Sequence, residues 1–373
     1  MWPVLSGTTE WFVIVTTAGL ITMVLGAVIG FFKHDLKALL AFSTVSHLGL
    51  ITMLLGTGTA FGAMAAVFHI LNHATFKAAL FMSAGIVDHE AHTRDMRRLG
   101  GLRHLMPITF AIATIAALSM AGIPFLNGFL SKEMMLEEAW HTVLFHSHWL
   151  VPGLAVLGSA FSAAYSFRLI SHTFLGPVRD DYPAKPHDPG AGMWLPPAIL
   201  VVLVVVIGVA PFLAEPFVKM VTASVLGEAA EVPKAYFKIW HGLVPALYMS
   251  IIAVVSGFVL LMLFNPLLRA WDAAPRPEAK TIFEALVEAI VRVSKSFIRP
   301  LHDGAFSRYA SIAAVAIIGA GYYAWVTGSV GAVTRPMQPA SAVTIAGWLM
   351  LVAASIGLVF FHRNRLFSLI LIG

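Results

Sequence analysis

Residues 66–87 read AVFHILNHATFKAALFMSAGIV, an apolar stretch that carries three ionisable side chains. His69, His73 and Lys77 follow one another at intervals of four residues, so they share one face of a helix. A lone histidine is usually a packing residue, but a charge in hydrocarbon is costly and faces a protein interior or a water-filled cavity. The stretch therefore predicts a membrane helix whose polar face takes part in proton movement.

The composition of the chain is that of a membrane protein. Hydrophobic residues make up 58% of the 373 residues, charged residues 12%, and the mean hydropathy is +0.83, whereas soluble proteins are about a quarter charged. The net charge of +5 is better explained by basic cytoplasmic loops than by nucleic-acid binding. The chain has no cysteine and so supplies no thiolate for zinc or iron–sulfur clusters. We expect no cofactor in it.

Apolar segments of about 20 residues, the length that crosses a bilayer, recur along the chain. The segment 106–147 is longer than one crossing and contains AGIPFLNGF at 121–129, so it is either two crossings or one broken helix. We predict membrane spans near the following residues: 9–32, 36–56, 60–87, 106–147, 150–176, 193–215, 240–264, 308–328 and 342–361.

The distribution of basic residues separates these two topologies. With one crossing at 106–147, most Lys and Arg residues lie in loops on one side, and only Lys219, Lys234, Lys238 and Arg335 lie opposite. Two crossings would divide the basic loops between both faces. Because basic loops are cytoplasmic, we predict one broken crossing with the loop 88–104 in the cytoplasm. Broken helices at membrane depth are buried or line cavities, and they mark ion sites in transporters.

Two further ionisable groups are candidates for the same pathway. Lys132 and Glu133 follow the break in FLSKEMMLEE, and Glu137 lies one turn beyond. These carboxylates could pair with Lys132 or carry protons outward. The alternative is an ordinary solvated helix start whose acidic residues complement the helix dipole.

In the segment 36–56, Lys37, Thr44 and His47 share a helical face. This face is a candidate hydrated path. It is equally consistent with hydrogen bonds between packed membrane helices, and Lys37 is close enough to the interface to snorkel. We count Lys37 among the pathway residues and give His47 a lesser place.

Two polar stretches receive other interpretations. His141, His146 and His148 have metal-like spacing, but no acidic or cysteine partner lies in the stretch, so we expect no metal site. The loop DHEAHTRDMRRLGGLRH, residues 88–104, mixes charges of both signs. It predicts a solvated connector, or a surface that docks a partner.

Residues 277–300 have a helical pattern of a different kind. Charged residues lie on the faces that flank an apolar stripe, so we predict an amphipathic helix along the cytoplasmic surface or against partner subunits. An ordinary loop helix is the alternative. The stripe consists of Phe283, Leu286, Ile290, Val293 and Phe297.

Three motifs together resemble a known family. They are KHDLKALLAFSTVSHLGLITMLLG at 33–56, the stretch 66–102, and AGIPFLNGFLSKE at 121–133. They are similar to the antiporter-like proton-conducting subunits shared by respiratory complex I and Mrp-type cation/proton antiporters. The run AGIVDHEAHTRDMRRLGGL at 84–102 is closer to the A-type subunit of the Mrp antiporters. The motifs cover residues 1–175, and helix order together with the surface helix extends the resemblance to 373.

The resemblance implies an all-α polytopic membrane protein built on inverted five-helix repeats, each with a broken helix that carries a buried lysine. Residues 1–176 would be the second repeat, a proton-channel half. Two transmembrane helices in 177–276, the surface helix 277–300 and further transmembrane helices in 301–373 would follow. The residues that match the family's second half-channel are Lys37, His69, His73, Lys77 and Lys132, with Glu133 beside the last.

The chain also departs from the family pattern, because the first repeat and the long carboxy-terminal extension of a full-length A-type subunit are missing. We expect a fragment, a split gene product or a chain completed by another polypeptide. The resemblance implies a subunit, not an enzyme, of a complex that exchanges Na⁺ or another monovalent cation for protons in the cell inner (plasma) membrane, together with other antiporter subunits. The alternatives are a proton-pumping subunit of an NADH–quinone oxidoreductase or membrane-bound hydrogenase, and a subunit that pairs with a soluble partner for inorganic-carbon uptake.

Overall fold

The computed structural model describes residues 2–227, 231–233, 237–275, 279–299, 305–328 and 339–372. These residues form helices and, apart from two isolated β-bridges, no β-structure. Eight of the described helices are long and apolar enough to cross a membrane, which confirms the all-α polytopic prediction. The chain divides into two compact units, 1–275 and 276–373. Lys234, Arg276 and Arg335 lie outside the described residues, as do 277, 278 and 300 of the predicted surface helix.

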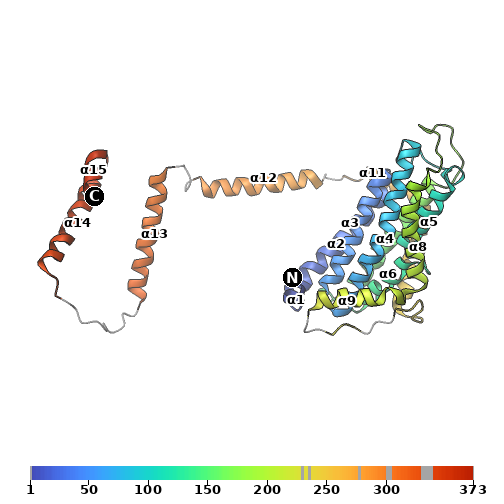
Figure 1. Ribbon diagram of the computed structural model, residues 1–373, viewed down its shortest axis with the longest axis horizontal. Coiled ribbons are helices and arrows are strands. Elements are labelled where there is room, and N and C mark those ends of the chain that lie inside the picture. The colour runs from blue at the N-terminus through green and yellow to red at the C-terminus, as the bar shows by residue number, and fades with distance from the viewer. Residues whose placement is uncertain are drawn as a thin grey trace. The chain divides into compact units, whose positions relative to one another are not determined.

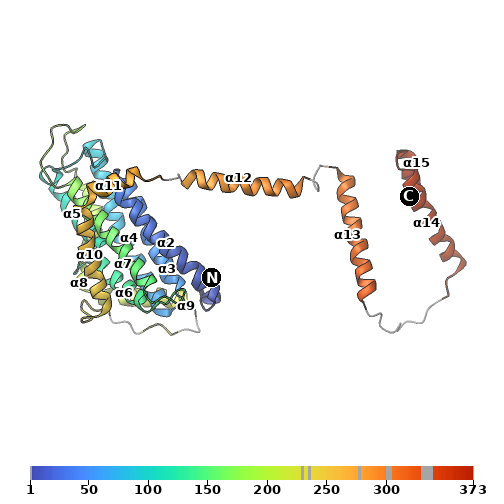
Figure 2. The same cartoon turned by 180° about the vertical axis from the view of Figure 1, so that it is seen from behind.

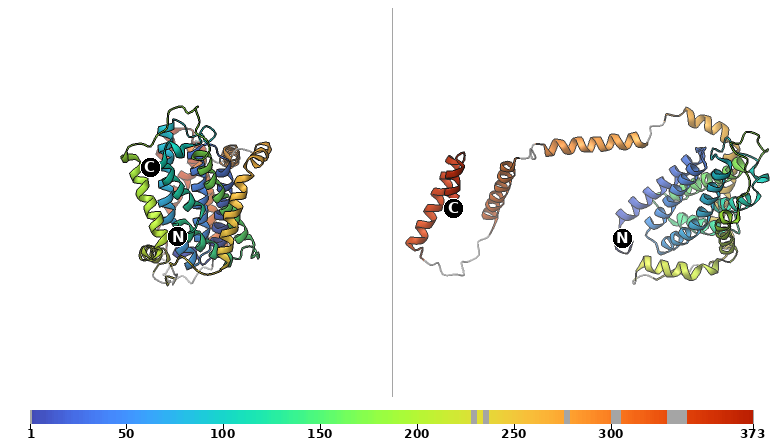
Figure 3. Two further views of the ribbon diagram at one scale, coloured as in Figure 1. Left: turned by 90° about the vertical axis from the view of Figure 1, so that its right-hand side faces the viewer. Right: turned by 45° about the horizontal axis from the view of Figure 1, so that its top comes forward.

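The first unit is a bundle of long helices (Figure 1). Helices α8 and α10 flank it on opposite sides (Figure 3, left). The side chains of Thr8, Asp35 and Thr59 cap the amino-terminal ends of α2, α3 and α4 by accepting hydrogen bonds from backbone N–H groups. The long helices are α2 (Thr9–Phe32), α3 (Leu36–Gly56), α4 (Ala60–Ala91), α5 (Pro107–Ala121), α6 (Asn127–His141), α7 (Leu150–Thr173), α8 (Ala191–Val209) and α10 (Pro245–Met262).

Glycines allow α2 and α3 to pack closely along their length. A Cβ atom added to Gly19 would collide with the backbone of Met53, and one added to Gly49 would collide with the backbone of Met23. Membrane helices associate through such small residues because close packing replaces the hydrophobic driving force. The two helices therefore pack with their backbones close together.

Helices α5 and α6 together make one crossing. At the start of α5, the N–H of Thr109 donates to Asp188, which follows α7, at 3.0 Å. Near the end of α6, the carboxylate of Glu138 accepts a hydrogen bond from Thr59, between α3 and α4, at 2.6 Å. These partners lie at opposite ends of the bundle, and Figures 1 and 2 show α5 and α6 in opposite halves of it. The predicted broken crossing is confirmed.

Most charged side chains of 88–104 are exposed, as expected of a solvated connector, but the stretch also packs onto the bundle. Helix α4 continues to Ala91, and Met96, Leu99 and Leu102 are buried. The backbone of Leu36 donates to Arg94 O at 3.0 Å, and Gly101 donates to Leu175 O at 2.8 Å. We call residues 33–36, 92–104 and 174–182 the rim, because they fold together over one end of the bundle.

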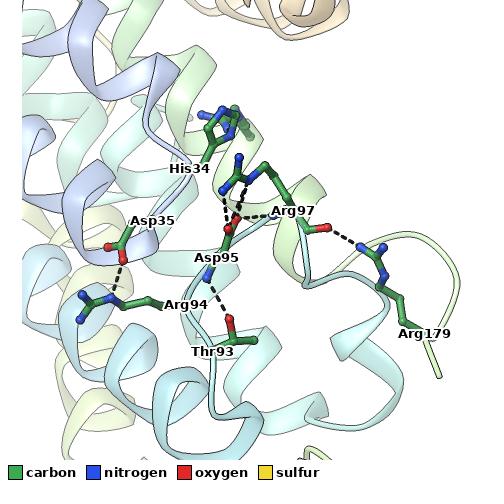
Figure 4. Close-up of polar contacts among 8 residues, drawn as sticks. His34, Asp35, Thr93, Arg94, Asp95, Arg97 and Arg179 are labelled. Carbon is green, nitrogen blue, oxygen red and sulfur yellow. Dashed lines mark hydrogen bonds and ion pairs between the residues drawn. The ribbon is translucent and has the colours of Figure 1, made fainter. Parts of the chain in front are cut away.

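Ion pairs at the surface of the rim complete this arrangement (Figure 4). Arg94 pairs with Asp35, and the guanidinium of Arg97 binds Asp95 with an Nη2–Oδ2 distance of 2.7 Å. Hydrogen bonding from Arg97 lowers the pKa of Asp95 below its ordinary value. Arg179 donates to the carbonyl oxygens of Arg97 and Leu99. These ion pairs and hydrogen bonds therefore join the segments of the rim to one another.

The connections after α7 contain helices that the apolar pattern did not separate. The predicted span 193–215 ends as α8 at Val209, and a short 3₁₀ turn (Pro211–Leu213) leads into α9 (Glu215–Leu226). Proline has no N–H to continue the helical ladder. Helix α9 runs across the end of the bundle opposite the rim (Figure 1). The predicted span 240–264 becomes α10, followed by the short helix α11 (Phe264–Ala273).

The second unit consists of α12 (Ala279–Ile298), α13 (Phe306–Thr327), α14 (Ala342–Phe361) and α15 (Arg365–Ile372). The apolar stripe of α12 is exposed, as in Phe283 and Ile290. Helices α13 and α14 have the length and hydropathy of membrane spans. The predicted helices in this region are present. That α12 lies along the membrane surface or against partner subunits stays a prediction.

Candidate proton pathway

A hydrogen-bonded chain of two histidines and a serine lies at the centre of the first unit. His47 Nδ1 of α3 is 2.9 Å from His69 Nε2 of α4, and His69 Nδ1 is 2.9 Å from Ser131 Oγ of α6. All three side chains are buried. Each nitrogen or hydroxyl acts as donor or acceptor according to the imidazole tautomer. The chain can therefore be oriented in either direction.

Lys77 lies to one side of this chain, deep in α4 and 5% exposed. Its ammonium donates to Ser43 Oγ and to Leu40 O, the latter at 3.4 Å, and lies 3.3 Å from Met120 Sδ. Hydrogen bonds to α3 and contact with the end of α5 replace the water that a charge would otherwise require. The structure thus places Lys77 against the break in the crossing.

Lys132 binds the other side of the same break. Its ammonium donates to Met120 O at 2.6 Å, to Ala121 O at 3.3 Å and to Ser162 Oγ of α7 at 3.0 Å. The last carbonyl groups of a helix lack intrahelical donors and carry partial negative charge, so they suit an ammonium. Of the alternatives for Glu133 and Glu137, a pairing with Lys132 is therefore not the one observed.

The break itself is built from a small set of polar groups. Ser119 Oγ donates to Asn127 Oδ1 at 2.7 Å and accepts from the N–H of Gly128 at 3.0 Å. Asn127 Nδ2 donates to Thr75 Oγ1 at 2.9 Å, and Asn72 Nδ2 donates to Asn127 O at 2.9 Å. These bonds tie the two half-helices to α4 and satisfy backbone groups that the break leaves open.

Gly122 ends α5 in a left-handed conformation with φ of +89°. Its N–H donates to Leu118 O and Ser119 O, which leaves the carbonyl groups of Met120 and Ala121 to Lys132. A glycine is favoured here because L-residues rarely adopt this conformation. The glycine predicted to interrupt the helix therefore also exposes the lysine-binding carbonyls.

A cavity of about 10 Å³ connects the histidine chain to Lys132. His47 Nε2 has no hydrogen-bond partner among the described residues, and this side chain lines the cavity together with Lys132 and Ser162. The volume is close to that needed for one water molecule, and polar groups line it. His47 and Lys132 therefore border one common cavity.

The remaining predicted residues lie further out. The ring of His73 is 5.2 Å from that of His47, centroid to centroid, but its Nε2 has no partner among the described residues. Lys37 pairs with Asp88 at 2.7 Å near the rim, with side chains 40% and 32% exposed. Glu133 is buried and its Oε2 lies 3.2 Å from His241 Nδ1. The structure thus does not bring Lys37 into direct contact with the central groups.

Sequence reasoning missed partners of two kinds. The carbonyl of Met120 is a backbone group, so no residue type signals it. Ser131 and Ser162 looked like ordinary small residues of membrane helices, although the position of Ser131 directly before Lys132 was a usable signal. His47, which received a lesser place, is part of the central chain. Within the described part of the chain, no group of three or more His, Asp or Glu side chains can hold a metal ion.

A further buried cation lies near the rim and was not assigned a role. Arg168 of α7 is 1% exposed, and its guanidinium donates to Lys33 O at 2.7 Å, to Phe31 O and to His34 Nδ1 at 3.0 Å. The guanidinium also lies over the ring of Phe264, 4.0 Å from its centroid. Burial, and then the positive charge of Arg168, lower the pKa of His34.

Comparison with known proteins identifies this arrangement. Residues 1–162, which include the histidine chain and both buried lysines, match the family described as NADH:quinone oxidoreductase/Mrp antiporter, TM. This part of the chain therefore resembles that family. Its resemblance to the A-type subunit of the Mrp antiporters is confirmed by the relatives that follow.

Two curated subunits of cation/proton antiporters illustrate the similarity. The probable K⁺/H⁺ antiporter A/B subunit of Rhizobium meliloti is 49% identical over 266 residues, which are 71% of this chain and 26% of that protein. The Na⁺/H⁺ antiporter A-type subunit of Alkalihalophilus pseudofirmus is 37% identical over 334 residues, 82% of this chain and 41% of that protein. The chain thus spans less than half the length of these relatives.

Solved structures show the same fold. A chain of the Mrp complex from Dietzia sp. has a TM-score of 0.68 and 32% identity, and the match covers 99% of this chain and 40% of that one. A chain of the archaeal membrane-bound sulfane sulfur reductase has a TM-score of 0.58 and 24% identity over 83% of this chain and 56% of that one. The second match concerns the fold alone.

Proposed function

We propose that this chain is a membrane subunit of a multisubunit monovalent cation/proton antiporter. It supplies a proton half-channel and has no catalytic site of its own. Other antiporter subunits, the lipid bilayer, protons and a cation such as Na⁺ are its partners, and the cell inner (plasma) membrane is its location. The relatives named as K⁺/H⁺ and Na⁺/H⁺ antiporter subunits support this assignment.

One observation carries the mechanism: Met120 contacts both buried lysines. Its sulfur lies 3.3 Å from the ammonium of Lys77 and its carbonyl 2.6 Å from that of Lys132. Two ammonium groups on one residue repel each other in a medium of low dielectric constant. Protonation of one lysine therefore favours release of a proton by the other, which is the switch that a relay needs.

The histidine chain provides the path between these switches. A proton that arrives at Ser131 is passed to His69 Nδ1, and the Nε2 proton of His69 passes to His47 Nδ1. His47 then releases a proton from Nε2, so each imidazole returns to a neutral tautomer. The cavity beside His47 then allows one water molecule to complete the route to Lys132. Protons move along this chain without movement of the helices that hold it.

The test is dye-reported proton flux in everted vesicles from an antiporter-deficient host that expresses the full complex. Lys132→Ala and Lys77→Ala should each lower cation-dependent flux by at least about tenfold, since a proton-transfer group typically contributes more than that. Both variants should insert normally, because removal of a buried charge also removes its desolvation cost. Lys219→Ala, which removes a half-exposed lysine paired with Glu215, is the matched control. Normal flux in Lys132→Ala would show that this lysine is structural.

The two α4 histidines should differ in the same assay. His69 bonds to both His47 and Ser131, whereas the Nε2 of His73 has no partner among the described residues. We therefore expect His69→Ala to reduce flux more than His73→Ala. The reverse order would move the path to the His73 side of the bundle.

Helix α12 is proposed to join the chain to the membrane surface or to partner subunits. Its exposed apolar stripe is the kind of face that an amphipathic helix buries on binding. Phe283→Asp or Ile290→Asp should reduce the amount of assembled complex but leave the flux per assembled complex unchanged. Unaltered assembly in both variants would contradict this role.

A proton-pumping subunit of a redox complex is the alternative function. The family includes the transmembrane subunits of NADH:quinone oxidoreductases, but the redox-complex structure described above supports the fold alone. Identification of the neighbouring genes separates the two functions. Small antiporter subunits support cation exchange, and iron–sulfur or quinone-site subunits support the redox complex.

A further inference from the structure

His241 connects a buried carboxylate to the end of the bundle opposite the rim. Its Nδ1 lies 3.2 Å from Glu133 Oε2, and the two side chains are 33% and 7% exposed. Glu133 follows Lys132 directly, yet Lys132 points to the carbonyl end of α5 while Glu133 turns to this histidine. The neighbouring charges on α6 thus face two different routes.

The segment that carries His241 is packed onto the bundle. Phe237 is 8% exposed and lies edge-on to Phe68 of α4, with ring centroids 5.1 Å apart. Phe237 also belongs to the apolar cluster that contains Phe129 of α6. This anchor holds the segment against α4 and α6. The position of His241 is therefore fixed from both α4 and α6.

We propose that His241 is the port through which protons pass between Glu133 and water at this end of the half-channel. This inference rests on the proposed function. In the inward direction, a hydronium ion at the surface gives a proton to Nε2 of the neutral ring, and water is released. The Nδ1–H bond of the imidazolium then breaks as an O–H bond forms on Glu133, which leaves the ring neutral again. The outward direction reverses both steps, and no other reactant is required.

A proton port differs from a structural latch in one respect that can be measured. In His241→Gln, an amide N–H remains to donate to Glu133 but cannot change its protonation state. A latch therefore survives this substitution, whereas a port does not. His148→Gln is the matched control, because His148 is an exposed histidine near the same end of the bundle.

The experiment measures dye-reported proton flux per assembled complex in everted vesicles with the full antiporter. We expect His241→Gln and His241→Ala each to lower flux by about tenfold or more, as for other proton-transfer groups, with His148→Gln unchanged. The exchanged pair Glu133→His with His241→Glu should recover part of the flux, since it restores two adjacent titrating groups.

The outcomes distinguish this inference from the proposed function. If Lys132→Ala abolishes flux while His241→Gln retains it, the lysine relay stands and the port is refuted. Loss in His241→Ala with full flux in His241→Gln identifies a latch and also refutes the port. If Lys132→Ala and Lys77→Ala both keep normal flux, the proposed function itself fails.

Discussion

Lys132 and Arg168 are both buried cations that bind carbonyl groups at the end of a helix, yet their surroundings differ. Lys132 binds the carbonyls of Met120 and Ala121 at the break in the crossing, beside a cavity shared with His47. Arg168 binds the carbonyls of Phe31 and Lys33 where α2 ends, under the ring of Phe264. In both places, carbonyl groups at the end of a helix stabilise a buried positive charge.

The chemistry of the two side chains is the reason why we propose different roles for Lys132 and Arg168. A buried lysine can change its protonation state, whereas arginine stays charged in proteins and offers a rigid fork of donors. Arg168 uses that fork to join α2, α7 and the residue that begins α11. Burial of a cation therefore does not by itself indicate a proton pathway, and the ability to titrate decides.

We expect the largest loss of transport when the lysine at the break is replaced by an arginine. Lys132→Arg should lower cation-dependent proton flux by about a hundredfold, because a group that cannot titrate loses its part in proton transfer. The complex should still assemble, since the charge on the α5 carbonyls is kept. Flux per assembled complex is the measurement. A variant with wild-type flux would mean that Lys132 acts as a fixed charge, as Arg168 does.

The reciprocal change should act on stability instead. Arg168→Ala leaves the carbonyls of Phe31 and Lys33 without their donor, and each unsatisfied buried group costs about 1–3 kcal/mol. We expect a lower thermal melting temperature and less assembled complex, with near-normal flux in the complexes that remain. Arg168→Lys should be intermediate because one ammonium replaces only part of the fork. Loss of flux without loss of stability would give Arg168 a transport role.

A more moderate change is expected from the glycine that exposes the lysine-binding carbonyls. A Cβ atom on Gly122 would lie 3.0 Å from Lys132 Cδ, so Gly122→Ala should displace the lysine and lower flux several-fold. Gly176→Ala is the control: it has a φ of +90° but open space around it. Both substitutions carry the cost of a left-handed conformation, roughly 1 kcal/mol. Equal flux in the two variants would rule out a contribution from the position of Lys132.

The smallest expected effect is a change in how the melting temperature depends on pH, and it arises at the rim. Burial and the charge of Arg168 lower the pKa of His34 from 6.5, so the folded protein favours neutral imidazole. The contact between His34 and Arg168 contributes its full stability above about pH 6.5. This contribution declines as the pH falls toward and through the lowered pKa of His34 in the folded protein. Melting temperatures between pH 8 and pH 5 should drop less in His34→Gln than in the wild type. Parallel curves would show that protonation of His34 does not affect the rim.

Local patterns in the chain were sufficient to predict the membrane class, the positions of most spans and the broken crossing. These features depend on runs of apolar residues, on the Gly122–Pro124 interruption and on the distribution of basic residues. The four-residue spacing also placed His69 and Lys77 on one helical face, and both prove to be buried.

The contacts of the ionisable groups became known only from the packed helices. Lys132 binds backbone oxygens of α5 and a serine of α7, and a backbone oxygen has no signature in a pattern of side chains. The charged stretch 88–104 looked like a solvated loop because its partners, Asp35 and Leu175, are distant in sequence. The contacts of Arg168 with the carbonyl groups of Phe31 and Lys33 likewise depend on the packing of α7 against the end of α2. Local hydropathy determines where helices form, but the packing of distant helices determines which groups each buried charge contacts.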